Sequence, residues 1–243
     1  MRKLIAISVA LLCSGISTGY AQDAVTYDWT GFYAGLHLGA ARGSINATDY
    51  TQPSGGFFTD LVPAGTEGFA FLDTNVAGGV HVGAQYQVNQ FVLGLEGTYD
   101  GTSARQSIVS PYFPDSDVLT GGLNRYVTAV GRIGVAVDRL MVYGKAGYAG
   151  GEVDFRARDN DALVTYDETT WHNGYAVGLG VDYALTDNVS IGLDYTHVDL
   201  GTAEHTGPNV FDDGSLGANS ETYRTSATAD AIMGRVSFKF GAK

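Results

Sequence analysis

The ionisable side chains that could do chemistry in this sequence stand one at a time between bulky apolar residues. Successive side chains of a β-strand point to opposite faces, so each of these charges would lie on the face opposite to its large neighbours. Carboxylates and cations gathered on one face can form either a fixed network of ion pairs or a path for ions. We expect the fixed network, because opposite charges in a narrow space can pair. Its predicted members are Glu96, Arg132, Lys145, Asp182, Asp194, Arg235 and Lys239.

The histidines and the remaining acidic motifs give weaker indications of chemistry. His37 and His81 share the face of the charges and could bind a metal or heme. Isolated interior histidines are more often hydrogen-bonded packing residues, however, and no Cys/His spacing predicts a zinc site. His197 has no adjacent serine to activate. Asp159-Asn160-Asp161 begins like a calcium loop, yet Leu163 occupies the next ligand position. We therefore predict no catalytic residues, no metal and no cofactor.

The segment from Gly174 to Leu185 shows most clearly which elements would position these side chains. Large apolar residues alternate there with glycine, alanine and Asp182, and a period of two predicts a β-strand whose faces meet different environments. Seven further segments repeat the pattern. The predicted strands cover residues 32–40, 76–88, 91–100, 127–137, 140–148, 174–185, 189–196 and 232–240.

The connections between these strands alternate between long and short. Stretches rich in Gly, Thr, Asp and Pro separate some strands, and turns of two or three residues separate the others. In an up-and-down barrel this alternation places every long loop at one end, as membrane β-barrels do. The sequence thus predicts an all-β fold, an eight-stranded antiparallel up-and-down transmembrane β-barrel with four long extracellular loops. The predicted loops are residues 41–75, 101–122, 150–170 and 199–228.

The direction in which each face points decides between this barrel and a soluble, lipocalin-like one. A soluble barrel would hold the apolar residues inside, around a ligand. Its outer face would then be the glycine and alanine set, which carries too little charge for solubility. In a membrane barrel the bulky residues face lipid and the charges face inward, where eight strands leave an interior just wide enough to be filled by side chains.

Aromatic residues cluster at the ends of the predicted strands, as they do at the two interfaces of a membrane barrel. Tyr175 and Tyr183 are eight residues apart. At about 3.3 Å per residue and a tilt near 45°, they straddle roughly 20 Å of height. Trp171 would lie near the outer interface. The predicted lipid-interface aromatics are Phe32, Tyr86, Phe91, Tyr99, Tyr148, Tyr175, Tyr183, Phe238 and Phe240.

The N-terminus of the 243-residue chain has the pattern of a secretory signal peptide. Residues 1–21 comprise a basic start, a short apolar core and the small-x-small sequence Gly19-Tyr20-Ala21. Cleavage would remove Cys13, so the barrel domain, residues 22–243, would contain no cysteine. Losing Arg2 and Lys3 takes the formal net charge from −12 to −14. This acidity speaks against nucleic acid as a partner, because phosphate contacts need Lys and Arg.

Three barrel-wall motifs carry a resemblance to a known family. They are Trp29-Thr30-Gly31-Phe32-Tyr33-Ala34-Gly35, then Gly178-Leu179-Gly180-Val181-Asp182-Tyr183 with Leu193-Asp194-Tyr195, and finally Arg235-Val236-Ser237-Phe238-Lys239-Phe240. With them the chain resembles the small outer-membrane β-barrel proteins of Gram-negative bacteria, of the opacity and OmpA type. It looks closest to the surface-antigen and porin-family proteins of α-proteobacteria, some of which bind heme.

The resemblance implies a location in the cell outer membrane. The expected partners are outer-membrane lipid, lipopolysaccharide and the outer-membrane assembly machinery, with a host or small-molecule ligand at the loops as a further possibility. We predict a non-enzymatic integral barrel with a structural and surface role in the cell envelope. Two alternatives stay open from the sequence: a narrow porin-like channel, and a surface receptor for heme or a host ligand.

Overall fold

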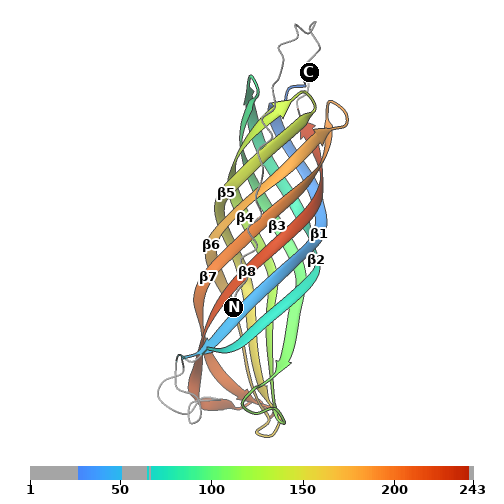
Figure 1. The fold of residues 1–243 in the computed structure, drawn as a ribbon. Helices are drawn as coiled ribbons and strands as arrows, with labels where there is room; N and C mark the ends of the chain where they lie inside the picture. The colour runs from blue at the N-terminus through green and yellow to red at the C-terminus, as the bar shows by residue number, and fades with distance from the viewer. Residues whose placement is uncertain (1–26, 51–64, 66, 241–243) are drawn as a thin grey trace, which may run out of the picture.

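A computed structural model describes residues 27–50, 65 and 67–240, and the predicted signal peptide lies outside this part of the chain. Eight antiparallel strands pair in sequence order, and β1 also pairs with β8, so the sheet closes into a barrel (Figure 1). The predicted fold class is confirmed. The strands are β1 (Gly31–Asp49), β2 (Glu67–Val88), β3 (Phe91–Val109), β4 (Asp117–Val137), β5 (Leu140–Asp159), β6 (Val164–Ala184), β7 (Val189–Phe211) and β8 (Leu216–Phe240).

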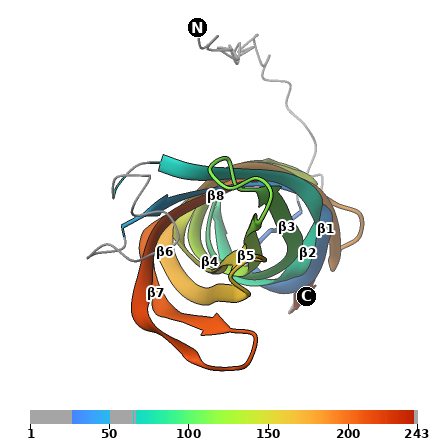
Figure 2. The ribbon, with the colours of Figure 1, turned by 90° about the horizontal axis from the view of Figure 1, so that it is seen from below.

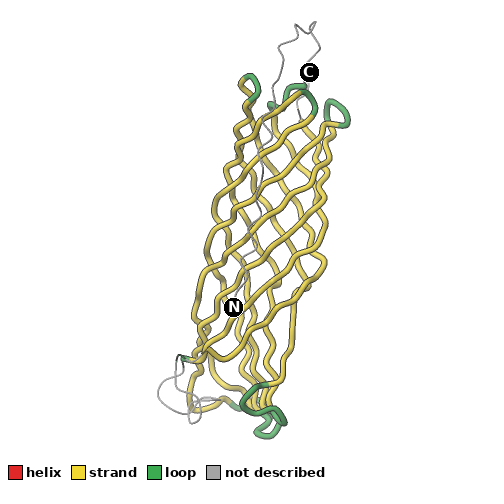
Figure 3. Tube along the Cα trace, viewed as in Figure 1, coloured by secondary structure: helices red, strands yellow, loops and turns green. Residues whose placement is uncertain are grey.

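The barrel is tall and narrow, and its strands are strongly tilted (Figures 1 and 3). At one end, here called the turn end, tight turns join β2 to β3, β4 to β5 and β6 to β7. Asn89 and Asp138 adopt positive φ angles of 54° and 51° in the first two turns, a conformation that Asn and Asp tolerate better than most residues. The opposite tip end carries the other connections. No helix among the described residues is long and apolar enough to cross a membrane.

The strands continue through most of the ranges predicted as loops, and this corrects the predicted loop boundaries. β5 runs to Asp159 and β6 starts at Val164, so a predicted loop at 150–170 is reduced to residues 160–163. The other two described connections at the tip end are residues 110–116 and 212–215. The region between β1 and β2 is described only at Tyr50 and Gly65.

The physical reason for the longer strands is an inversion of the hydrophobic pattern along the barrel. Towards the turn end, large apolar side chains point outward and polar ones inward. Towards the tip end, Val153, Phe155 and Ala157 point inward and are fully buried, whereas the intervening residues on β5 are mostly charged. Apolar and polar residues therefore still alternate along β5, but the apolar residues face inward in the tip half instead of outward, and the strand continues without a break.

Three layers of side chains fill the barrel from end to end. At the turn end, the segment from Tyr27 to Thr30 closes the mouth: Trp29 donates from Nε1 to the Asp138 carbonyl oxygen at 3.2 Å, and its ring packs edge-on against Tyr27. Charged and polar residues form the middle layer. An apolar core fills the tip half, built around Ile45, Phe69, Phe71, Leu119, Leu123, Val153, Phe155, Tyr166, Leu200 and Tyr223.

Candidate functional site

All seven predicted charges are buried, and six of them lie in the middle layer. Glu96 of β3 lies at its centre. Its Oε2 accepts hydrogen bonds from Arg132 Nη1 at 2.9 Å and from Arg235 Nη2 at 2.5 Å. One carboxylate thus joins two guanidinium groups that come from strands on different sides of the barrel.

The remaining charges extend this cluster across the lumen. Arg132 Nη2 donates to Asp182 Oδ2 at 2.9 Å, and Lys145 Nζ donates to Asp194 Oδ1 at 2.7 Å. Arg235 lies 3.7 Å from a carboxylate oxygen of each of these two aspartates. Three cations therefore face three carboxylates, which is the pairing that buried charges need in a low-dielectric interior. We call Glu96, Arg132, Lys145, Asp182, Asp194 and Arg235 the lumen ion network.

Lys239 was also predicted to join this group, and the structure places it elsewhere. It is buried at the turn end, where its ammonium lies 4.1 Å from the centre of the Tyr27 ring and donates to the Asp28 carbonyl oxygen. Its strand register explains the difference, because Lys239 is four residues closer to the end of β8 than Arg235. Lys239 thus helps to close the mouth of the barrel.

Two tyrosines that the sequence reasoning missed complete the network. Tyr33 donates to Glu96 Oε2 at 2.9 Å and accepts from Arg132 Nη1 at 2.5 Å. Tyr143 donates to Asp194 Oδ2 at 2.8 Å and accepts from Arg235 Nη1 at 3.0 Å, and its ring lies 3.7 Å from the Arg132 guanidinium carbon. Hydroxyl groups that donate and accept at once hold the charges in fixed positions.

Cross-strand glycines make room for these tyrosines. Tyr33 pairs with Gly83, and Tyr143 pairs with Gly180. A Cβ atom at either glycine would collide with the hydroxyl end of the facing tyrosine. The sequence held a usable indication, since each tyrosine stands alone among glycines and charges on the inward face.

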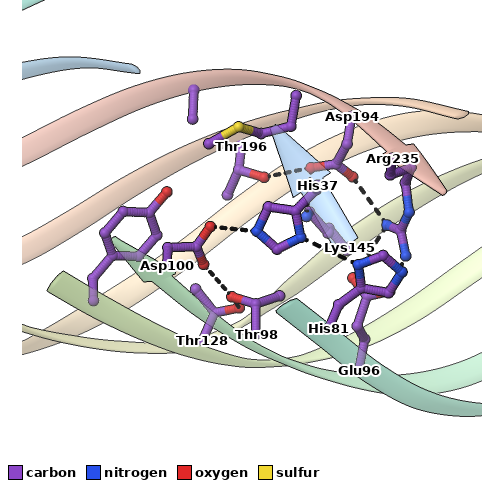
Figure 4. Close-up of a pocket in the computed structure, with 13 residues that line it drawn as sticks. His37, His81, Glu96, Thr98, Asp100, Thr128, Lys145, Asp194, Thr196 and Arg235 are labelled. Atoms are coloured by element: carbon purple, nitrogen blue, oxygen red, sulfur yellow. Dashed lines mark hydrogen bonds and ion pairs between the residues drawn. The ribbon is translucent and has the colours of Figure 1, made fainter. Parts of the chain in front are cut away.

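A chain of hydrogen bonds lies beside the lumen ion network on its tip side (Figure 4). His37 donates from Nε2 to Asp100 Oδ1 at 2.6 Å, which leaves its Nδ1 to accept from His81 Nδ1 at 3.1 Å. His81 Nε2 then accepts from the Ser237 hydroxyl at 2.8 Å. All four ring nitrogens are engaged. The adjoining cavity of about 20 Å³ has room for a single water molecule.

The other motifs considered in the sequence form local contacts. Asp159 Oδ1 accepts from the backbone nitrogens of Asp161 and Ala162, so this segment is a capped turn. His197 lies on the outer surface with its Nδ1 2.9 Å from Asp230 Oδ1. Among the described residues, no group of three or more His, Cys, Asp or Glu side chains could hold a metal ion.

The nine predicted interface aromatics all lie on the outside of the barrel, and each residue is 43–71 % exposed. Aliphatic residues such as Leu93, Leu95, Val177 and Leu179 are exposed between them. A continuous apolar belt of this extent is unfavourable in water and marks a surface that contacts another apolar phase. Beyond the belt, β6 continues eleven residues from Tyr175 to Val164, which at about 3.3 Å per residue and a tilt near 45° is roughly 25 Å.

Comparisons with known proteins agree with this geometry. Residues 8–240 match the family model described as an outer membrane protein beta-barrel domain. The chain is 32% identical over 208 residues to the 31 kDa outer-membrane immunogenic protein of Brucella melitensis, with 81% of each chain covered. It is 28% identical over 181 residues to the 22 kDa outer membrane protein of Rhizobium leguminosarum bv. viciae, covering 73% of this chain and 67% of that protein.

Solved structures share the fold. The outer membrane protein OprG from Pseudomonas aeruginosa has a TM-score of 0.54 at 13% identity, covering 89% of this chain and 99% of that one. The outer membrane protease OmpT from Escherichia coli has a TM-score of 0.53 at 12% identity, covering 86% of this chain and 97% of that one. Together with the exposed apolar belt and the family match along nearly the whole chain, these findings show that the chain is an outer-membrane protein that belongs to the outer membrane β-barrel domain family.

Proposed function

We propose that this protein is a closed, non-enzymatic barrel with a structural and surface role in the cell envelope. The observation that carries the proposal is the filled interior. An aromatic closure at the turn end, the lumen ion network in the middle and an apolar core at the tip end follow one another along the axis. A charge network alone could line an ion path, but an apolar core stacked on it disfavours the passage of ions.

The tip half supports a surface role. It projects roughly 25 Å beyond the apolar belt as a continuation of the barrel wall, using the strand rise and tilt given above. Its three described connections are bonded together: Asn160 donates from its backbone to the Ser116 carbonyl at 3.1 Å, and Asp212 to the Leu163 carbonyl at 3.0 Å. The Brucella relative is named an outer-membrane immunogenic protein. A rigid tip that projects from the membrane fits a role at the cell surface for this chain as well. Lipid and lipopolysaccharide at the belt, and the machinery that inserts such barrels, are its expected partners.

The hydrogen-bonded chain of histidines in the lumen supports the proposal that the protein is not an enzyme. Ser237, His81, His37 and Asp100 include residue types that catalytic triads use. His37, His81 and Asp100 line a cavity of about 20 Å³ inside the wall, which admits one water and no larger substrate, and Ser237 lies next to it through its hydrogen bond with His81. Their ring nitrogens are already engaged, so they also offer no free ligand to a heme iron.

Planar-bilayer recording tests the closed state. Purified, folded protein is expected to give no stepwise conductance under conditions in which an open porin, added to the same bilayer, conducts. The physical reason is that the apolar core would have to admit ions without water or counter-charges. Regular conductance steps whose size changes in the Arg132→Met variant would contradict the proposal and favour a narrow channel through the network.

Cysteine labelling tests which end is displayed. The chain has a single cysteine, Cys13, and it lies in the predicted signal peptide. Ala162→Cys at the tip end is expected to react with a membrane-impermeant maleimide in intact cells. The matched variant Thr186→Cys, at the turn end, should react only after the outer membrane is permeabilised. The opposite labelling order would show that the turn end faces outward and would remove the surface role of the tip.

A further inference from the structure

The apolar belt is hollowed on the outer faces of its first four strands. A groove of about 660 Å³ crosses β1, β2, β3 and β4, which are neighbours in the closed ring of strands (Figure 2). Val82 and Leu95, both exposed, stand on either side of the groove where it passes from β2 to β3. Small residues between large ones thus leave a recess in the belt. The outward-facing residues of its floor are Ala34, Ala84, Gly97, Ala129 and Gly131.

The packing of the barrel wall does not explain the two glycines in this floor. A Cβ atom at Gly97 or Gly131 would have its nearest neighbours at 3.8 and 3.9 Å, which is ordinary van der Waals contact. Gly83 on the inward face differs, because a Cβ atom there would collide with the Tyr33 ring. Strand interiors favour larger residues, and a glycine within a strand often marks a place that a ligand approaches closely. The groove therefore has the form of a binding surface for a group outside this chain.

The groove has the direction of an acyl chain in a bilayer. Phe32 at its turn-side end is the second residue of β1, whereas Gly131 is six residues from the end of β4 at the turn end. Ladder pairs lead across the four strands from Phe32 to Gly131. With strands about 4.8 Å apart this path is roughly 14 Å long, and a tilt near 45° makes it rise by roughly 10 Å. A hydrocarbon chain in the groove would therefore run from the edge of the belt into the bilayer.

A polar pocket continues the groove at the rim of the turn end, and we call it the rim pocket. Thr30 and Tyr86 line this pocket, which has a volume of about 560 Å³. They are two residues from Phe32 and Ala84 of the groove, a spacing that keeps side chains on the same face of an extended chain. The exposed Asp28 carboxylate is its charged group, and no lysine or arginine is among the described residues that line it. The other lining residues are Tyr27, Gln87 and Asn89.

The rim pocket combines a negative charge with neutral hydrogen-bond donors. Asp28 Oδ1 accepts from the backbone nitrogen of Thr30 at 2.8 Å. Lys239 lies inside the mouth and donates to the backbone carbonyl of Asp28, not to its carboxylate. The Tyr86 hydroxyl and the Asn89 amide can both donate hydrogen bonds. An ammonium group and a phosphate group on one headgroup would use both features, whereas a purely anionic headgroup would place its charge beside Asp28.

We propose that the groove and the rim pocket bind one phospholipid whose headgroup carries an ammonium group. One acyl chain lies in the groove, where it fills the recess between the large side chains, and the ammonium group lies at Asp28. Contact along the recess holds the acyl chain, and the charge of Asp28 selects the headgroup, because like charges repel. The inference rests on the contact with lipid that the proposed function includes. It does not rest on the closed lumen, so it can fail while the conductance test succeeds.

Native mass spectrometry of retained lipid tests the proposal. The full mature chain is inserted into vesicles of phosphatidylethanolamine and phosphatidylglycerol in equal amounts, extracted in a mild detergent and weighed with its bound lipid. We expect one phosphatidylethanolamine per chain, favoured over phosphatidylglycerol by at least about fivefold, because it alone brings a positive charge to Asp28. Asp28→Asn should retain one phospholipid and lose this preference.

Filling the groove provides the second comparison. Gly97→Leu should lower the retention of lipid at least about tenfold, because the new side chain displaces several methylene groups of the acyl chain. Gly144→Leu is the matched control. Gly144 is an outward-facing glycine of β5 outside the groove, where a Cβ atom would also have its nearest neighbour at 3.9 Å. This variant should retain one phospholipid.

The site is overturned by a wild-type protein that retains no phospholipid or shows no headgroup preference, and by equal retention in Gly97→Leu and Gly144→Leu. A preference that survives in Asp28→Asn would contradict the position of the ammonium group. A pair of chains without lipid, abolished by Gly97→Leu, would assign the groove to a second copy of this chain instead. The wild-type measurement needs no variant, so the proposal can fail even if a substitution prevents folding.

Discussion

Replacing Glu96 by Gln is expected to lower the free energy of unfolding by about 3–5 kcal/mol, the usual cost of removing one partner from a buried charge pair. The side chain keeps its size and loses the charge that faces both Arg132 and Arg235. Arg132 would retain Asp182 at 2.9 Å, whereas the nearest other carboxylate oxygens lie 3.7 Å from Arg235. The network would then hold three cations against two carboxylates. Urea unfolding in lipid vesicles, followed by tryptophan fluorescence, measures the loss.

Glu152→Gln provides the matched control. Glu152 pairs with Arg125 on the outer surface, where half of the Arg125 side chain is exposed, and exposed ion pairs contribute about 0–1 kcal/mol. The double variant Glu96→Gln, Arg132→Met removes one charge of each sign and should recover part of the loss, as a double-mutant cycle would show. If Glu96→Gln is no more destabilising than Glu152→Gln, the lumen ion network does not stabilise the wall.

The wall and the charges of the turn half could be predicted from the sequence because one rule governs both. Side chains alternate across a strand, so Glu96, Arg132 and Arg235 had to share the face opposite to the bulky residues. Parity, however, places a residue on a face without giving its height along the axis. Parity therefore predicts Lys239 in the network although it closes the mouth, and it does not predict which charges Tyr33 and Tyr143 contact.

The tip half could not be predicted in the same way, because its pattern is that of a water-exposed barrel. In the stretch Glu152-Val153-Asp154-Phe155-Arg156-Ala157 the apolar residues alternate as regularly as in the turn half, but with charges outward. A prediction that looks for strands with apolar residues on the lipid-facing side therefore assigns such a stretch to a polar loop. Along one continuous strand, the outward-facing residues are apolar in the turn half and charged in the tip half. We infer that the membrane surface lies where this change occurs.

Phe155→Ala is the variant expected to affect the tip half most, with a loss of about 3–5 kcal/mol in the free energy of unfolding, the usual cost of deleting a buried phenylalanine side chain. The ring is fully buried, with its centre 4.6 Å from that of Tyr223 and 6.2 Å from that of Tyr166. Truncation would leave a cavity, because strands fixed by main-chain pairing on both sides cannot collapse into it. Urea unfolding in vesicles measures the effect.

Phe211→Ala, at the exposed tip of β7, is the control for the same chemical change without burial, and substitutions at such surface positions usually stay within about 0.5 kcal/mol. The comparison decides what holds the projecting half together. A large difference between the two variants means that the part beyond the apolar belt is stabilised by its own core, as a soluble barrel is, and can remain closed above the membrane. Equal small effects would mean that main-chain pairing alone maintains the column, and the filled interior on which the closed state rests would then be loosely packed at the tip end.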